Sequence, residues 1–237
     1  MSGETLTFAE MLHYRHRFLR YRNRTEPDTV NFIKEEFEPG GVALDIGANK
    51  GIVTYFLGKQ AGQNGRVIAF EPQPELGRQI SRVANTFGLR NVDVHSIGLS
   101  DEDGMATLYR GNIGSTANLV VGAEWQTEEL RVPIRSLDSF FEVAGIERLN
   151  FVKCDVDGYE VPVLKGAEKV LMKFHPKVLI EIQDTDVPEV AEILKRYGYD
   201  GGVFCFKGRR YPASETQNVG YRHAIAKWRN FLFCKSK

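Results

Sequence analysis

Short apolar runs and longer segments of helical periodicity alternate along most of this chain. Five runs have the length and composition of strands, at residues 42–46, 66–70, 92–97, 149–155 and 177–182. Segments with apolar residues at helical spacing follow them, at residues 52–58, 74–87, 137–145, 159–174 and 187–197. This alternation predicts an α/β fold with a mostly parallel sheet, which binds ligands at the carboxyl ends of its strands.

The carboxyl-terminal part of the chain predicts a different strand pairing. Residues 203–206 and 230–234 are apolar runs joined by a long polar connection. We expect them to pair antiparallel and to complete a seven-stranded sheet with helices on both faces.

The amino-terminal segment, residues 5–24, has the pattern of an amphipathic helix. Its apolar positions, expected to face the core, are Phe8, Met11, Leu12, Phe18 and Leu19. Its other face is basic, with Arg15, Arg17, Arg20, Arg22 and Arg24. This face is either solvated or an electropositive rim that gathers an anionic substrate. A second helix is expected at residues 27–37, so residues 1–36 are predicted to be a helical extension packed on a core domain of residues 37–237.

The segment of residues 101–135 interrupts the strand–helix alternation. Two short extended runs, at residues 106–109 and 130–134, flank a polar loop that includes residues 111–118. Long connections inside compact domains are usually functional or mobile. This loop is therefore expected to be either a functional segment or an ordinary solvated loop.

The turn after the first predicted strand carries the clearest ligand signal. Asp45 precedes Gly47 and Gly51, which suit a tight turn and a close approach of the backbone to a ligand. A dinucleotide pyrophosphate binds at such a helix start, and an aspartate there would repel it. Asp45 instead suits a cationic ligand such as S-adenosylmethionine, which carries an ammonium and a sulfonium group.

Acidic and basic residues at two further strand ends extend this site. Glu71 ends the second strand, where an acid usually binds the hydroxyl groups of a ribose. In the fourth strand, Lys153, Asp155 and Asp157 share one side, because side chains alternate with period two. A buried lysine needs a partner, and Glu181 in the neighbouring fifth strand is the expected one.

Three sequence blocks together resemble the FkbM family of S-adenosylmethionine-dependent methyltransferases. They are residues 45–51 (DIGANKG), residues 70–74 (FEPQP) and residues 152–160 (VKCDVDGYE). The similarity spans about residues 37–182, with the blocks in the family's order and spacing. The family usually has Glu where this chain has Asp157, so any contact of that side chain differs. The resemblance implies a Rossmann-like class I methyltransferase fold, with residues 37–237 as the S-adenosylmethionine-binding domain.

The resemblance also implies which residues hold the cofactor. They are expected to be Asp45, Gly47, Ala48, Asn49, Gly51, Glu71, Pro72, Leu99 and Ser115. Leu99 would lie beside the adenine. The resemblance also implies that the loop of residues 111–118 covers the substrate side of the site. Ser115 and Thr116 would reach the cofactor or the acceptor from this loop.

Methyl transfer to a hydroxyl requires alignment of the acceptor and removal of its proton. Asp155 is the expected base, Lys153 would tune it or stabilise the developing alkoxide, and Glu181 completes the catalytic set. Glu160 is expected to cap the following helix. These carboxylates also allow binding of a hard cation as a lesser alternative, but no metal is expected, and the five histidines lack zinc-ligand spacing.

The leading interpretation is O-methylation of a sugar, a polyketide or another small metabolite, a substrate class that the resemblance implies. A nicotinamide-dependent oxidoreductase is disfavoured, because the first glycine of the dinucleotide fingerprint is missing and Asp45 occupies the phosphate position. A non-catalytic module that only binds S-adenosylmethionine is the alternative from another class.

The amino-acid composition limits the binding partners and the cellular location to be expected. The 237 residues balance 31 Lys and Arg against 31 Asp and Glu, which gives no reason to expect nucleic acid or an anionic membrane. No apolar run reaches the length of a membrane span, and no signal peptide is recognisable. The three cysteines lack the spacing of a disulfide framework, so a cytoplasmic location is expected. The expected partner is a small-molecule acceptor. No feature indicates an oligomeric state.

Overall fold

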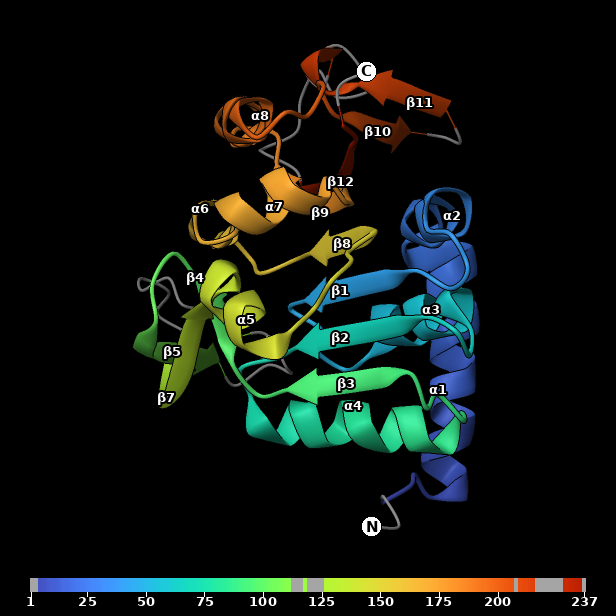
Figure 1. Ribbon diagram of the computed structural model, residues 1–237. Helices are drawn as coiled ribbons and strands as arrows, with labels where there is room; N and C mark the ends of the chain where they lie inside the picture. Colours follow the sequence, from blue (N-terminus) through green and yellow to red (C-terminus); the bar gives the residue numbers. More distant parts are fainter. Residues whose placement is uncertain (1–3, 112–116, 119–125, 207–208, 216–227, 236–237) are drawn as a thin grey trace.

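The computed structural model describes residues 4–111, 117–118, 126–206, 209–215 and 228–235. Its centre is a sheet with strand order β11-β10-β12-β9-β8-β1-β2-β3 (Figure 1). The parallel strands are β1 (Val42–Ile46), β2 (Arg66–Phe70), β3 (Val92–His95), β8 (Phe151–Cys154) and β9 (Lys177–Gln183). They share one direction, so their carboxyl ends form a single edge on which a ligand site can be built.

Antiparallel strands complete the sheet beside β9. Strand β12 (Trp228–Phe233) pairs with β9, β10 (Val203–Phe206) pairs with β12, and β11 (Arg209–Pro212) pairs with β10. The predicted antiparallel pair of β10 and β12 is confirmed. The predicted count of seven strands is wrong for the described residues, because β11 adds an eighth strand outside β10.

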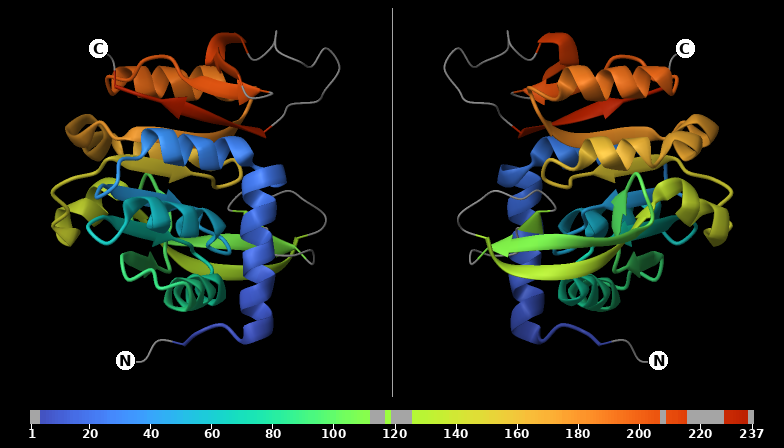
Figure 2. Two further views of the ribbon diagram at one scale, coloured as in Figure 1. Left: turned by 90° about the vertical axis from the view of Figure 1, so that its right-hand side faces the viewer. Right: turned by 90° about the vertical axis from the view of Figure 1, so that its left-hand side faces the viewer.

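Helices cover both faces of the sheet (Figures 1 and 2). One face packs against α2 (Pro27–Glu36), α3 (Ile52–Ala61) and α4 (Pro74–Thr86). The other packs against α5 (Leu137–Ala144), α6 (Glu160–Lys165), α7 (Glu168–Phe174) and α8 (Val187–Arg196). The parallel strands are therefore buried on both sides, which explains their continuous apolar runs.

The helix predicted at residues 159–174 is divided into α6 and α7. Gly166 lies between them and packs against the end of strand β4 (Gly98–Ser100). A Cβ atom at Gly166 would lie 1.9 Å from the carbonyl oxygen of Ser100. This close contact between two backbones fixes the break, and helical periodicity does not reveal it.

A second, smaller sheet has the strand order β4-β7-β5-β6. Its other strands are β5 (Gly104–Gly111), β6 (Ala117–Asn118) and β7 (Gln126–Ser136). Strands β5 and β7 contain the two predicted extended runs and pair antiparallel, with Leu108 opposite Leu130. In Figure 1 the arrows of the parallel strands point toward this sheet, so it stands beside their carboxyl edge.

The amino-terminal helix α1 (Phe8–Arg20) runs across the strand direction (Figure 2) and continues into a π-helix, η1 (Tyr21–Thr25). Its predicted apolar face is partly wrong: Tyr14 and Phe18 are buried, whereas three of the expected core residues are exposed. The exposed residues are Phe8, Leu12 and Leu19. The orientation is set by aromatic packing, since the Phe18 ring stacks on Tyr55 of α3 with centroids 3.8 Å apart. Within the described part of the chain, no helix has the length and apolar character needed to cross a membrane.

Candidate active site

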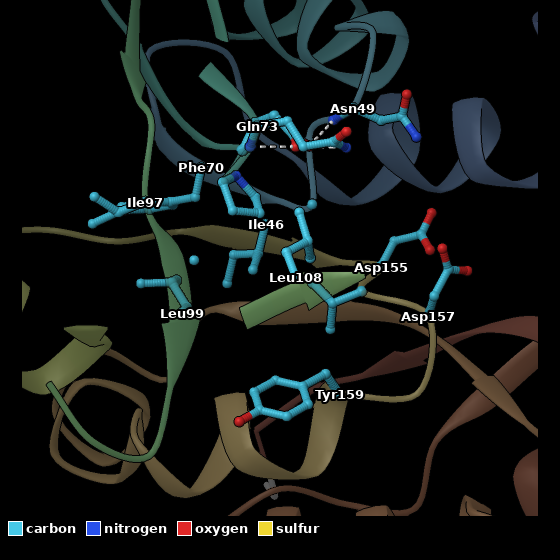
Figure 3. A pocket seen from close by; sticks show the side chains of 15 residues that line it. Ile46, Asn49, Phe70, Gln73, Ile97, Leu99, Leu108, Asp155, Asp157 and Tyr159 are labelled. Carbon is cyan, nitrogen blue, oxygen red and sulfur yellow. Dashed lines mark hydrogen bonds between the residues drawn. The ribbon is translucent and has the colours of Figure 1, made fainter. Parts of the chain in front are cut away.

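Two cavities meet at the carboxyl edge of the parallel strands. We call them the Leu99 cavity and the Lys153 cavity, and Gly47, Asn49 and Asp155 line both. The Leu99 cavity faces the second sheet (Figure 3), and the Lys153 cavity faces the amino-terminal helices.

The Leu99 cavity has largely apolar walls from both sheets. Its apolar residues include Ile46, Phe70, Pro72, Ile97, Leu99 and Leu108. Pro72 and Leu99 were among the residues expected at the cofactor. Leu108 of β5 was not foreseen, because the sequence does not show that β5 turns back toward β1. Tyr159 closes one side, with its hydroxyl 3.2 Å from the Ser100 hydroxyl.

Glu71 is the acid that the end of β2 contributes to the Leu99 cavity. It is 4% exposed, and its carboxylate accepts the backbone N–H of Asn49 at 2.8 Å and that of Gln73 at 3.0 Å. Burial raises its pKa, while these hydrogen bonds lower it. Glu71 thus ties the glycine loop to the end of β2 and lines the cavity.

The glycines of the loop have separate structural tasks. Gly47 has φ of 79°, and a Cβ atom there would lie 1.8 Å from the carbonyl oxygen of Asp155. Gly47 therefore lies close to the backbone that follows β8, whereas the sequence suggested that it approaches a ligand. Gly51 has φ of 74° and precedes α3, and it lines neither cavity. Ala48 is buried, and of the two cavities it lines only the Lys153 cavity.

A row of polar side chains crosses the sheet at the Lys153 cavity. Asp45 of β1 lies opposite Lys153 of β8, and Glu181 of β9 lies opposite Asn230 of β12. The neighbouring positions on the same face are apolar: Ala43, Phe151 and Leu179 lie two residues earlier along the parallel strands, and Leu232 lies two residues later along the antiparallel β12. The sheet therefore changes from core to polar site within one period of the strands.

Lys153 is at the centre of this row and is fully buried. Its Nζ lies 3.3 Å from Asp155 Oδ2 and 3.9 Å from Glu181 Oε2, which confirms the predicted pairing with Glu181. Burial lowers the Lys153 pKa, but the charges of Asp155 and Glu181 outweigh it and hold the pKa above its ordinary value. Lys153 is thus a cation over the whole physiological pH range.

The carboxyl groups around Lys153 are partly held in the neutral form. Burial raises the pKa of Glu181 to about 8, against the opposing charge of Lys153. Burial also raises the pKa of Asp45 to about 6, although the Thr54 hydroxyl donates a hydrogen bond to it. Asp45 lies within β1, one residue before its end, and not at the strand tip as the sequence suggested.

The amino-terminal segment contributes residues to the Lys153 cavity that were not predicted as site residues. The Glu26 carboxylate accepts hydrogen bonds from the Tyr21 hydroxyl at 2.8 Å, the Thr29 hydroxyl at 2.9 Å and the Asn230 amide at 3.3 Å. Arg17 and Lys50 also line this cavity. The basic face of residues 5–24 was the only signal: it included Arg17 but gave no indication of Tyr21, Glu26 or Lys50.

The turn after β8 separates Asp155 from Asp157. Asp155 follows the strand directly, while Asp157 has φ of 51° and lies in the Leu99 cavity beside it (Figure 3). The predicted alternation that placed Lys153, Asp155 and Asp157 on one side therefore ends at Asp155. Glu160 accepts the N–H groups of Val156 and Gly158 and so ties the turn before α6 together. The prediction that it caps the helix is wrong, because Glu160 is the first residue of α6 and, among the described residues, no side chain caps this helix.

Ser115 and Thr116 lie outside the described residues. Within the described ranges, no three His, Cys, Asp or Glu side chains gather closely enough to hold a metal ion.

Comparison with known families decides how this edge is to be understood. Residues 45–200 match the model of the methyltransferase FkbM domain, and this segment begins at Asp45 and includes Glu71, Lys153, Asp155 and Glu181. The chain belongs to the FkbM methyltransferase family. The match omits α1, η1 and α2, so the amino-terminal wall of the Lys153 cavity lies outside the family segment.

Three relatives of this FkbM chain carry methyltransferase names. Methyltransferase 1 of Beauveria bassiana is 24% identical, over 82% of this chain and 90% of its own length. The hexuronic acid methyltransferase AglP of Haloferax volcanii is 27% identical, over 72% and 68%. The 2-O-methyltransferase NoeI of Sinorhizobium fredii is 27% identical, over 57% and 61%.

Solved structures agree on the fold. Methyltransferase FkbM from Methylobacillus flagellatus superimposes with a TM-score of 0.56 and 16% identity, covering 98% of this chain and 56% of that one. Fibrillarin from Aeropyrum pernix, solved with bound S-adenosyl-L-methionine, gives 0.51 and 13%, covering 88% and 74%. The predicted Rossmann-like class I methyltransferase fold is confirmed.

Proposed function

We propose that this protein transfers the methyl group of S-adenosylmethionine to a hydroxyl group of a small molecule, with a sugar as the preferred class. The observation that carries the proposal is the meeting of two unlike cavities at Asp155. One has apolar walls and an acid at the end of the second strand, and the other is lined by carboxylates around one lysine. An adenosine fits the first, and the cationic methionine end fits toward the second.

The charge balance of the Lys153 cavity supports a cationic ligand. Four carboxyl groups surround Lys153, those of Asp45, Asp155, Glu181 and Glu26. Arg17 and Lys50 line other parts of the same cavity. Burial raises the pKa of Asp45 and that of Glu181, because a carboxylate removed from water is costly to ionise. A ligand with an ammonium or a sulfonium beside Asp45 would favour its ionised form. A nicotinamide dinucleotide would bring its pyrophosphate to the same edge and be repelled.

Bound S-adenosylmethionine supplies an electrophilic methyl group and a neutral thioether leaving group. Asp155, at the shared border of the two cavities, would accept the proton of the acceptor hydroxyl as its oxygen attacks. Lys153, 3.3 Å away, orients Asp155 and stabilises negative charge on the attacking oxygen. Glu181 holds Lys153 from the other side. The apolar walls keep water from competing with the acceptor.

The names of the relatives support an oxygen acceptor on a sugar. One is a hexuronic acid methyltransferase and another a 2-O-methyltransferase.

The three cysteines form no disulfide, which supports a reducing compartment such as the cytoplasm.

Calorimetric titration with S-adenosylmethionine, S-adenosylhomocysteine and NAD tests the cofactor, and radiolabelled methyl transfer to a panel of sugars and sugar acids tests the activity. We expect binding of the first two ligands, no binding of NAD, and transfer to hydroxyl-bearing sugars. Tighter binding of NAD would refute the proposal. Binding of S-adenosylmethionine without transfer to any acceptor would favour a non-catalytic binding module.

A further inference from the structure

Arg17 and Lys50 form a cation pair at the border of the Lys153 cavity. Arg17 comes from α1, and Lys50 comes from the glycine loop, and both line the same cavity as Asp45. Both side chains are half-buried. Among the described residues, neither side chain forms an ion pair with a carboxylate, although Glu26, Asp45 and Asp155 line the same cavity.

Tyr14 holds the two cations in place. Its ring packs under the Arg17 guanidinium, with the Cζ atom 5.7 Å from the ring centroid. Its hydroxyl donates a hydrogen bond to the backbone carbonyl of Lys50 at 3.1 Å. The Gln79 amide in turn donates to the Tyr14 hydroxyl at 3.3 Å. Tyr14 is only 4% exposed, so the arrangement is built into the packing of α1 on the core.

The two like charges oppose each other. Burial lowers the pKa of Lys50, and the charge of Arg17 lowers it further. Two cations brought together without an anion are unfavourable unless an anionic ligand joins them. The cavity is therefore lined both by carboxylates and by this cation pair.

We propose that Arg17 and Lys50 bind a carboxylate in this cavity, that of the methionine end of S-adenosylmethionine. The ammonium and the carboxylate of this ligand are attached to the same carbon atom, so both groups must be recognised in one small space. Asp45 would face the ammonium, and the cation pair would face the carboxylate. This inference rests on the proposed function, and it makes α1, which lies outside the matched family segment, part of the cofactor site.

Two variants and one matched control test it by calorimetry. Arg17→Gln and Lys50→Met each remove one cation, and Arg20→Gln removes an exposed arginine of the same helix that does not line the cavity. The ligands are S-adenosylmethionine and its decarboxylated form, which keeps both cationic groups. We expect each cavity variant to weaken S-adenosylmethionine about tenfold or more, the range of hydrogen bonds to charged groups. Binding of the decarboxylated form should be nearly unchanged, and Arg20→Gln should resemble wild type.

The other source of a carboxylate is a sugar acid acceptor. It is probed by binding of a methyl glucuronoside and the neutral methyl glucoside to the protein loaded with S-adenosylhomocysteine. Loss of glucuronoside binding alone, with S-adenosylmethionine unaffected, would support a carboxylate site and assign it to the acceptor.

Equal losses for S-adenosylmethionine and its decarboxylated form, or no loss for any carboxylate ligand, would overturn the inference. If the wild-type protein bound no S-adenosylmethionine, the proposed function would fail, and this inference with it.

Discussion

Replacement of Asp45 by Asn separates the stability of the fold from its ligand affinity. Asp45 is 2% exposed, and burial moves its pKa from 3.8 to about 6. Each pKa unit corresponds to about 1.4 kcal/mol, so the ionised carboxylate costs the folded state about 3 kcal/mol. The folded-state pKa of Asp45 lies above the unfolded value, so folding favours the protonated carboxyl group. The stability that this protonation contributes is fully present below the unfolded pKa and is lost as the pH rises through about 6.

The expected result is therefore a change in the pH dependence of unfolding. From pH 4 to pH 7.5 the wild-type protein should lose about 2.4 kcal/mol more unfolding free energy than Asp45→Asn does, because part of the full change already lies below pH 4. Urea denaturation at the two pH values measures this difference and cancels any constant effect of the amide. Asp200→Asn is a matched control, because Asp200 is exposed at the opposite edge of the sheet, beside Cys234.

The same variant should bind S-adenosylmethionine about tenfold to a hundredfold more weakly, since it loses a charged partner for the ammonium group. A gain in relative stability together with a loss of affinity is the signature of a buried charge kept for a ligand. If Asp45→Asn bound S-adenosylmethionine as tightly as the wild-type protein, Asp45 would be only the partner of Thr54, and the charge argument would be refuted.

Three further substitutions test the rest of the site. Asp155→Asn should retain cofactor binding and lose single-turnover methyl transfer by ~10²–10⁴-fold, as for a general base. Its control in the same turn, Asp157→Asn, should lose far less activity. Similar losses in both variants would mean that Asp155 acts only through its charge. Lys153→Met leaves two carboxyl groups without their cation, so urea unfolding should show a loss of about 3–5 kcal/mol; a stability equal to wild type would mean that Glu181 and Asp155 are already neutral. Gly47→Ala places a Cβ atom against the carbonyl of Asp155, so its melting temperature should fall sharply, and a wild-type melting curve would contradict the tight contact after β8.

Much of the fold and part of the site follow from the sequence alone. Continuous apolar runs located β1, β2, β8 and β9, because strands buried on both faces have no polar side. The residues that end these runs are also legible: Glu71 after β2 and Asp155 after β8. The carboxyl ends of parallel strands share one edge, and strand order alone therefore brings these acids together. The pairing of Lys153 with Glu181 was predictable for the same reason.

Other features were decided only by the tertiary structure. Periodicity identifies the apolar residues of α1, but the aromatic cluster that receives Phe18 determines which of them are buried. The hydrogen bond from Asn230 to Glu26 joins residues 204 positions apart, and no local pattern encodes such a contact. Leu108 reaches the Leu99 cavity only because the second sheet folds back over the strand ends. The spacing of apolar residues along the chain indicates which residues are suited to burial. Which segment buries them depends on packing between distant parts of the chain. The amino-terminal wall of the site belongs to this second class.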